Sequence, residues 1–185
     1  MTTLINTTLC YIEKDNSYLM LHRTKKEKDY NKDKWIGIGG KFENGESPED
    51  CAVREIREET GLIVETSDLE YCGIVTFVDM TGVGEVRSKH ATEVACANTP
   101  TPPYTEFMHI FRVRKFDGVL KTDCDEGDLE WVPLAKLKEL PHWQADEIFY
   151  DFLAENHPFY SLKAVYKNNR LIKTWLNGAP YNHWT

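Results

Sequence analysis

The stretch GKFENGESPEDCAVREIREETGL, residues 40–62, carries the clearest structural signal in the chain. Its central part has apolar residues at helical spacing. Ser47 stands where an N-cap is expected, and Asp50 lies near the matching capping-box position. Gly61 follows the last periodic residue, and glycine readily adopts the left-handed conformation that closes a helix. We therefore predict an amphipathic helix over residues 48–60.

Three carboxylates share one face of this helix, because Glu55, Glu58 and Glu59 stand at relative positions i, i+3 and i+4. Like charges at this spacing destabilise a helix by roughly 0.2–0.5 kcal/mol per pair, so an opposite charge must compensate. Arg54 lies four residues before Glu58 and suits a surface ion pair. On these grounds alone, the cluster is either a solvated face or a set of ligands for a cation.

The segment before the helix favours the cation site. WIGIGGK, residues 35–41, is a glycine-rich loop that allows close backbone approach and leaves peptide groups free for a ligand. Carboxylates together with a carbonyl suit a hard cation such as Mg²⁺, which binds through a few carboxylates and the substrate's phosphates. Phe42 excludes both a Walker A loop and a dinucleotide fingerprint, since it occupies a required Ser/Thr or Gly position.

Composition restricts the partners of the protein. With 22 basic and 30 acidic residues the formal charge is −8, so no surface for a nucleic-acid polymer is expected. The sequence has no secretory start and no run of 18 apolar residues, which predicts a cytoplasmic protein without membrane contact. Five cysteines without a CxxC pair indicate reduced structural thiols. A small nucleotide is compatible with the acidic charge, because a bound divalent cation reverses the local field.

The remaining chain alternates between strand-like and helix-like patterns. Helices are expected at residues 145–156 and, in a shorter form, after Pro133. Apolar, β-branched runs predict strands at about residues 4–13, 17–23, 70–78, 106–116, 160–166 and 170–176. This arrangement predicts a single α/β (α+β) domain over residues 1–185, with helices packed on a mixed sheet. Residues 79–105 form a long loop insertion, for which a tolerated surface excursion is favoured over a lid or dimer contact.

Residues 40–62 resemble the Nudix box: Gly, five residues, Glu, seven residues, Arg-Glu, an aliphatic residue, any residue, Glu-Glu, any residue, Gly and an aliphatic residue. All its fixed identities are present, namely Gly40, Glu46, Arg54, Glu55, Glu58, Glu59 and Gly61. At average residue usage, chance agreement is on the order of 10⁻⁸ per starting position. The resemblance implies a Nudix fold, with a mixed β-sheet sandwiched between α-helices, and a diphosphate-cleaving Nudix hydrolase that uses Mg²⁺ or Mn²⁺.

The resemblance also implies roles for individual residues. The implied metal ligands are the Gly39 carbonyl, Glu55, Glu58, Glu59 and Glu126. The implied catalytic group comprises Glu55, Glu58 and Arg54. Within it, Glu55 acts as a further ligand or as the base that activates water, while Arg54 orients the carboxylates. Glu46 would support the unit of loop and helix instead of entering the chemistry.

A wider part of the chain looks like the family branch that hydrolyses oxidised purine nucleoside triphosphates, through residues 35–41 and 124–149. The substrate-binding residues that this likeness implies are Thr8, Arg23, Lys41, Trp143 and Asp146. The two cations suit phosphate oxygens. Trp143 offers a stacking face, and Asp146 offers hydrogen bonds to a purine edge. Equally, Trp143 suits a core anchor, and Asp146 suits the N-terminus of a helix.

The likeness to this branch implies that a nucleoside triphosphate and water give a monophosphate and pyrophosphate. The expected substrate is 8-oxo-dGTP. The expected role is sanitation of the nucleotide pool, a form of DNA repair. Ile36 and Ala145 depart from the branch, standing where a polar base-reading residue and an acid are found. A hydrolase of ADP-ribose or a nucleotide sugar therefore stays open. A non-catalytic nucleotide sensor fits the complete carboxylate set less well. The expected assembly is a monomer or homodimer.

Overall fold

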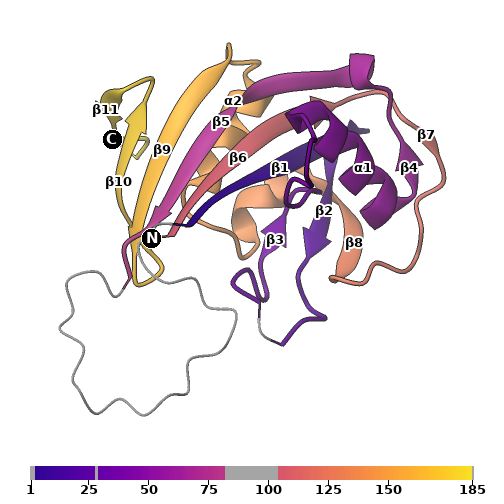
Figure 1. Ribbon diagram of the computed structural model, residues 1–185, viewed down its shortest axis with the longest axis horizontal. Helices are drawn as coiled ribbons and strands as arrows, with labels where there is room; N and C mark the ends of the chain where they lie inside the picture. Colours follow the sequence, from indigo (N-terminus) through magenta and orange to yellow (C-terminus); the bar gives the residue numbers. More distant parts are fainter. Residues whose placement is uncertain (1–2, 28, 82–103, 185) are drawn as a thin grey trace.

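A computed structural model describes residues 3–27, 29–81 and 104–184 (Figure 1). The long strands are β1 (Thr3–Lys14), β2 (Ser17–His22), β5 (Leu69–Asp79), β6 (Tyr104–Val113), β8 (Asp128–Pro133), β9 (Tyr160–Lys167) and β10 (Arg170–Leu176). The short strands are β3 (Trp35–Ile36), β4 (Leu62–Ile63), β7 (Asp117–Gly118) and β11 (Ala179–Tyr181). In the described residues, nine strands form one sheet in the order β11-β10-β9-β5-β6-β1-β2-β3, with β8 also paired to β2. The sheet is mixed, because β1 runs parallel to β6 and β5 runs parallel to β9.

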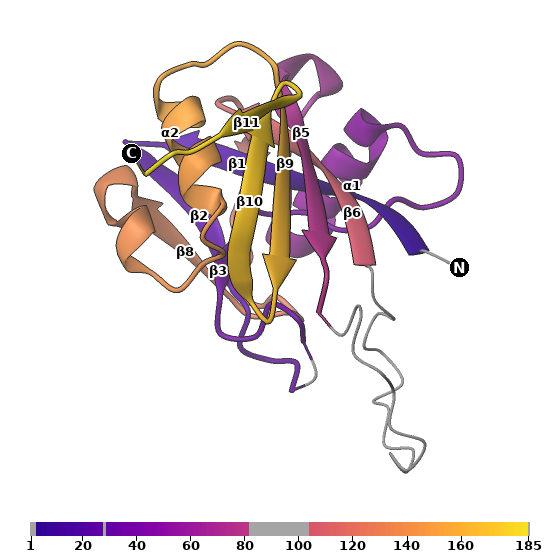
Figure 2. The same ribbon diagram turned by 90° about the vertical axis from the view of Figure 1, so that its left-hand side faces the viewer.

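Helices cover both faces of this sheet (Figures 1 and 2). α1 (Pro48–Thr60) buries Ile56 in one core together with Cys10 of β1. α2 (Asp146–Ala154) packs on the other core, to which β1 contributes Tyr11. Successive residues of a strand point to opposite faces, so β1 supplies both cores. The predicted mixed sheet with helices packed on it is confirmed (Figures 1 and 2).

The predicted caps of α1 are present. The Ser47 hydroxyl accepts from the Asp50 amide at 3.1 Å, and the Asp50 carboxylate accepts from the Ser47 amide at 3.0 Å. Gly61 closes the helix with a φ of 75°, in the left-handed region where a side chain is disfavoured. The local signals in the sequence were therefore sufficient to define this helix.

Other expected elements differ in detail. The helix expected after Pro133 is the 3₁₀ helix η2 (Leu134–Glu139). It ends before Leu140, which precedes Pro141 and is held extended. A second 3₁₀ turn, η1 (Thr66–Asp68), was not expected. β6 ends at Val113 instead of continuing to residue 116. The whole of β8 was missed, because its acidic residues and closing proline conceal the strand pattern.

Most of the predicted insertion, residues 82–103, lies outside the described residues, as does Cys96. Its two ends belong to β5 and β6, which pair with each other as antiparallel neighbours. The four described cysteines are buried and form no disulfide bonds with one another. No helix in the described part of the chain is both long and apolar enough to cross a membrane.

Candidate active site

The glycine-rich loop lies along β1, where it is held by main-chain hydrogen bonds. Ile38 and Cys10 exchange amide-to-carbonyl bonds of 2.6 and 3.0 Å, and the Thr8 amide donates to the Gly40 carbonyl at 2.9 Å. A Cβ atom on Gly39 would lie 2.2 Å from the Thr8 carbonyl oxygen, and one on Gly40 would lie 2.3 Å from a Glu55 carboxylate oxygen. The two glycines therefore let the loop contact β1 on one side and α1 on the other.

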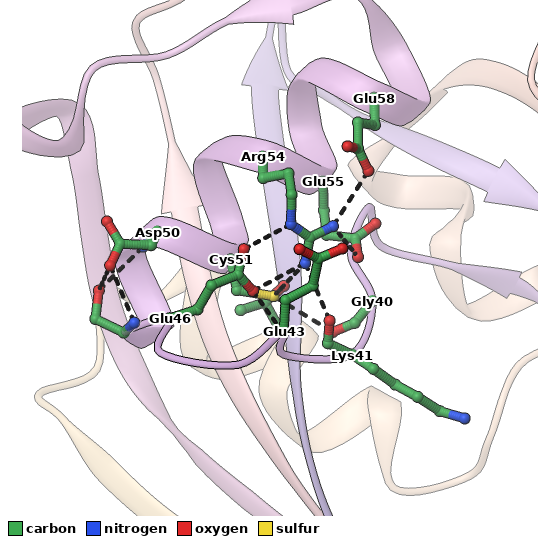
Figure 3. A network of polar contacts seen from close by, with 11 residues as sticks. Gly40, Lys41, Glu43, Glu46, Asp50, Cys51, Arg54, Glu55 and Glu58 are labelled. Atoms are coloured by element: carbon green, nitrogen blue, oxygen red, sulfur yellow. Dashed lines mark hydrogen bonds and ion pairs between the residues drawn. The ribbon is translucent and has the colours of Figure 1, made fainter.

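Arg54 joins this loop to α1 (Figure 3). Its guanidinium binds both oxygens of Glu46, at 2.6 and 2.9 Å, and also donates to the Lys41 carbonyl at 3.0 Å. Its Nη1 contacts Glu55 at 2.8 Å and Glu58 at 3.2 Å. These bonds to Arg54 lower the pKa of Glu46 to about 2. Arg54 thus supplies the positive charge that the acidic face requires.

Glu59 has a different environment from its neighbours. It is 7% exposed, and its Oε2 accepts from the Gly39 amide at 3.0 Å. Burial raises the pKa of the Glu59 carboxyl to about 7, and the nearby charge of Glu55 adds to the rise. The Gly39 hydrogen bond and the charges of Arg23 and Lys121 oppose it. A positive charge placed beside such a buried carboxyl would stabilise its ionised form and lower its pKa.

The spacing of the three glutamates in α1 places them on one helical face, but their side chains differ in exposure. The Glu58 side chain is 60% exposed, whereas that of Glu55 is 14% exposed and rests on the loop. Glu126 pairs instead with Arg23 and Lys26. Across residues 3–27, 29–81 and 104–184, no three His, Cys, Asp or Glu side chains converge as a ready metal site.

The chemistry of the donors nevertheless fits a hard divalent cation. The groups at the junction of loop and helix are carboxylate and peptide oxygens, which magnesium prefers to nitrogen or sulfur. Glu59 is buried with its pKa raised, so a nearby cation would favour its charged form. Gly40 has no side chain, and the Glu55 carboxylate occupies the space that a Cβ atom would fill. Arg54 forms ion pairs with both Glu55 and Glu58.

The two cations expected to hold phosphate lie in different settings. Arg23 binds Asp29 through Nε at 2.6 Å and also pairs with Glu126, so its charge is already engaged. The Lys41 side chain is exposed and extends away from the Arg54 network (Figure 3). Of the two, Lys41 is the group that can reach a ligand without exchanging an ion pair.

The structure brings Trp143 and Asp146 together. The Asp146 carboxylate accepts from the Trp143 amide at 3.2 Å, and the Asp146 amide donates back to the Trp143 carbonyl at 2.8 Å. Burial raises the pKa of Asp146 to about 8. Thr8 does not join them, because its hydroxyl contacts Cys51 at 3.5 Å on the α1 face of β1. The alternation of β1 therefore separates Thr8 from the predicted base pocket.

Residues 30–34, which the sequence analysis did not single out, cover Trp143. The Tyr30 ring stacks on Trp143 with 5.1 Å between ring centroids and an interplanar angle of 21°. Asn31 accepts from the Trp143 indole at 2.8 Å, and the Lys34 ammonium lies 4.4 Å from the ring centroid. Trp143 is consequently 8% exposed. No periodic or motif signal marks this polar segment, so only the tertiary structure reveals the contact.

The chain is similar in sequence and in fold to known proteins. The family profile described as "NUDIX domain" matches residues 3–153. The uncharacterized Nudix hydrolase YvcI of Bacillus subtilis is 28% identical over 153 residues, which cover 83% of this chain and 81% of the relative. The oxidized purine nucleoside triphosphate hydrolase of Danio rerio is 26% identical over 136 residues, covering 72% and 71% respectively. The crystal structure of a MutT protein from Bacillus halodurans has a similar fold, with a TM-score of 0.73 and 22% identity over 95% of this chain and 99% of that chain.

Proposed function

Because the chain belongs to the Nudix family and is a Nudix hydrolase, we propose that it hydrolyses a purine nucleoside triphosphate to the monophosphate and pyrophosphate. An oxidised purine such as 8-oxo-dGTP is the proposed preferred substrate. The observation that carries the hydrolytic part is the Arg54 network beside the buried Glu59. The purine part is supported by the pairing of Trp143 with Asp146 and by the relative from Danio rerio.

Nudix hydrolases use a divalent metal ion, and Mg²⁺ is the ion proposed here. When bound, it offsets phosphate charge and makes water more acidic. The residues proposed to hold it are the Gly39 carbonyl, Glu55, Glu58, Glu59 and Glu126. Among these, the oxygen-only donor set and the buried Glu59 carboxyl are the features that suit a hard cation.

The chain's own groups supply positioning and proton transfer. Glu55 is fixed between Arg54 and Gly40, so its carboxylate is proposed to receive the proton of the attacking water. Glu46 holds Arg54 through two hydrogen bonds and thereby fixes the direction in which Glu55 and Glu58 point. Lys41 is proposed to contact a phosphate oxygen directly, whereas Arg23 must first exchange Asp29 or Glu126 for it.

The base is proposed to bind against Trp143 and Asp146. Asp146 has a raised pKa, so near neutral pH its carboxyl both donates and accepts hydrogen bonds, which suits the mixed donor and acceptor edge of a purine. Tyr30 stacks on one face of Trp143. The base is proposed to take this face, which requires the Tyr30 ring to move aside.

A magnesium-dependent hydrolysis screen with product identification tests the proposal. The panel holds canonical and oxidised purine triphosphates, ADP-ribose and a nucleotide sugar, each with and without a chelator. Glu58→Gln is expected to lower kcat/KM by more than about 100-fold, beyond the loss typical of groups that only support a metal ligand. Glu49→Gln, on the first turn of the same helix, is the matched control. Full magnesium-dependent turnover by Glu58→Gln would refute the assigned site.

The products decide between the alternatives. Pyrophosphate released from a purine triphosphate supports the proposal, whereas monophosphates released only from ADP-ribose or a nucleotide sugar replace it with a hydrolase of diphosphate-linked nucleotides. No hydrolysis of any substrate in the panel would contradict the proposed reaction and favour the alternative of a nucleotide sensor. If 8-oxo-dGTP has no advantage in kcat/KM over dGTP, the oxidised-purine preference fails while the hydrolase assignment stands.

A further inference from the structure

The strand that follows α2 is β9, and it contacts the candidate base site through Tyr166. Tyr166 lies near the end of β9, which pairs with β5, and it is fully buried. Its ring stacks on Phe77 with 4.9 Å between centroids and meets Trp143 edge-on at 5.2 Å. The family profile ends at residue 153, so Tyr166 lies beyond the part of the chain that defines the family.

The Tyr166 hydroxyl also fixes the backbone of this site. It accepts a hydrogen bond of 2.8 Å from the amide of Ala145, the residue that precedes α2. Alanine has no side chain that can cap the helix, and its position directly precedes Asp146. Burial raises the pKa of the Tyr166 hydroxyl, so the group stays neutral. One side chain therefore contacts the Trp143 ring and holds the peptide next to Asp146.

We infer that Tyr166 is a positioning residue for the nucleobase site, holding Trp143 by ring contact and Asp146 through the Ala145 amide. This inference rests on the proposed function, because it assigns Tyr166 to the base site of that reaction. A base that stacks on Trp143 and bonds to Asp146 needs the two side chains at a fixed separation. Tyr166 contacts the Trp143 ring and accepts from the amide of Ala145, the residue that precedes Asp146.

The test compares two tyrosines of the same strand. Tyr166→Phe keeps the ring but removes the acceptor of the Ala145 amide. Tyr160→Phe is the matched control, since Tyr160 is equally buried and its hydroxyl has no hydrogen-bond partner in the described part of the chain. One lost hydrogen bond corresponds to about a 2- to 12-fold effect. Tyr166→Phe is expected to raise KM for the purine triphosphate within that range and leave kcat unchanged, whereas Tyr160→Phe changes neither.

Hydrogen exchange of the Ala145 amide provides a readout that does not depend on turnover. Exchange is expected to be faster in Tyr166→Phe than in the wild type and unchanged in Tyr160→Phe. A wild-type KM in Tyr166→Phe, despite faster exchange at Ala145, would overturn the inference. So would an equal rise of KM in both variants, because packing alone would then explain it. A Tyr166→Phe protein that does not fold would assign the hydroxyl to stability only and would also overturn it.

Failure of the proposed function gives a different result. If the wild-type protein hydrolyses a diphosphate-linked nucleotide instead of purine triphosphates, the proposed substrate is wrong. The comparison of Tyr166→Phe with Tyr160→Phe is then made with that nucleotide. A KM effect confined to Tyr166→Phe would still support the positioning role, and its absence would still refute it.

Discussion

Replacing Asp146 by asparagine is expected to reduce the dependence of stability on pH. Asp146 is 6% exposed, and burial raises its pKa from 3.8 to about 8, opposed in part by the hydrogen bond from the Trp143 amide. Between these two values the folded protein keeps a proton that the unfolded chain releases. The stability that this carboxyl contributes is therefore fully present below about pH 4 and is lost as the pH rises towards about 8.

The size of the effect follows from one proton. A difference of one bound proton changes the free energy of unfolding by about 1.4 kcal/mol per pH unit, so from about pH 4.5 to about pH 7.5 the loss is up to about 4 kcal/mol. Asparagine keeps an oxygen that accepts from the Trp143 amide but carries no ionisable proton. The difference between the two proteins therefore isolates Asp146, since Glu59 titrates in both.

Urea unfolding at constant ionic strength, repeated at several pH values in this interval, measures the effect. The free energy of unfolding of the wild type should fall with pH relative to that of Asp146→Asn. Glu155→Gln, which changes an exposed carboxyl just after the same helix, should follow the wild type. Parallel pH curves for the wild type and Asp146→Asn would show that the Asp146 carboxyl is not protonated in the folded protein.

Three further changes test other parts of the site and core. Gly40→Ala places a Cβ 2.3 Å from a Glu55 oxygen, so kcat/KM should fall by about 100-fold, and steady-state kinetics near wild type would contradict the close approach. Tyr30→Ala removes a stacked ring from Trp143, and because such a pair contributes about 0.5–1.5 kcal/mol, KM for the purine triphosphate should fall about 2- to 12-fold; an unchanged or higher KM argues against competition for that face. Arg112→Met removes the donor to a buried main-chain carbonyl and should cost about 1–3 kcal/mol in urea unfolding, whereas unchanged stability would show that the carbonyl finds another partner.

The sequence predicted the elements whose determinants are local. The caps of α1 lie within three residues of its start and one residue of its end, so Ser47 and Gly61 could be identified without a structure. The period of apolar residues likewise located six of the strands, including β9 and β10. It could not give their order, because the parallel pairings of β1 with β6 and of β5 with β9 join segments far apart in the chain.

The candidate site was predicted in the same uneven way. The spacing of Glu55, Glu58 and Glu59 identified the acidic helix, but their different burial depends on what packs against each of them. Thr8 was grouped with Trp143, although the β1 pleat turns its side chain to the opposite face. Tyr30 could not be found at all, since its contact joins two segments that share no sequence pattern.

The place of β9 in the sheet has a consequence for how this protein can be shortened. A fragment cut at residue 153, where the family profile ends, would keep the whole loop and acidic helix but would strip the partner from seven consecutive residues of β5. Those residues, Gly73–Asp79, would present unsatisfied amides and carbonyls to other molecules, which is the usual starting point for intermolecular strand pairing and aggregation. A fragment that ends at residue 153 would thus be prone to aggregate. A low yield of soluble fragment would therefore say nothing about the catalytic activity of the intact chain.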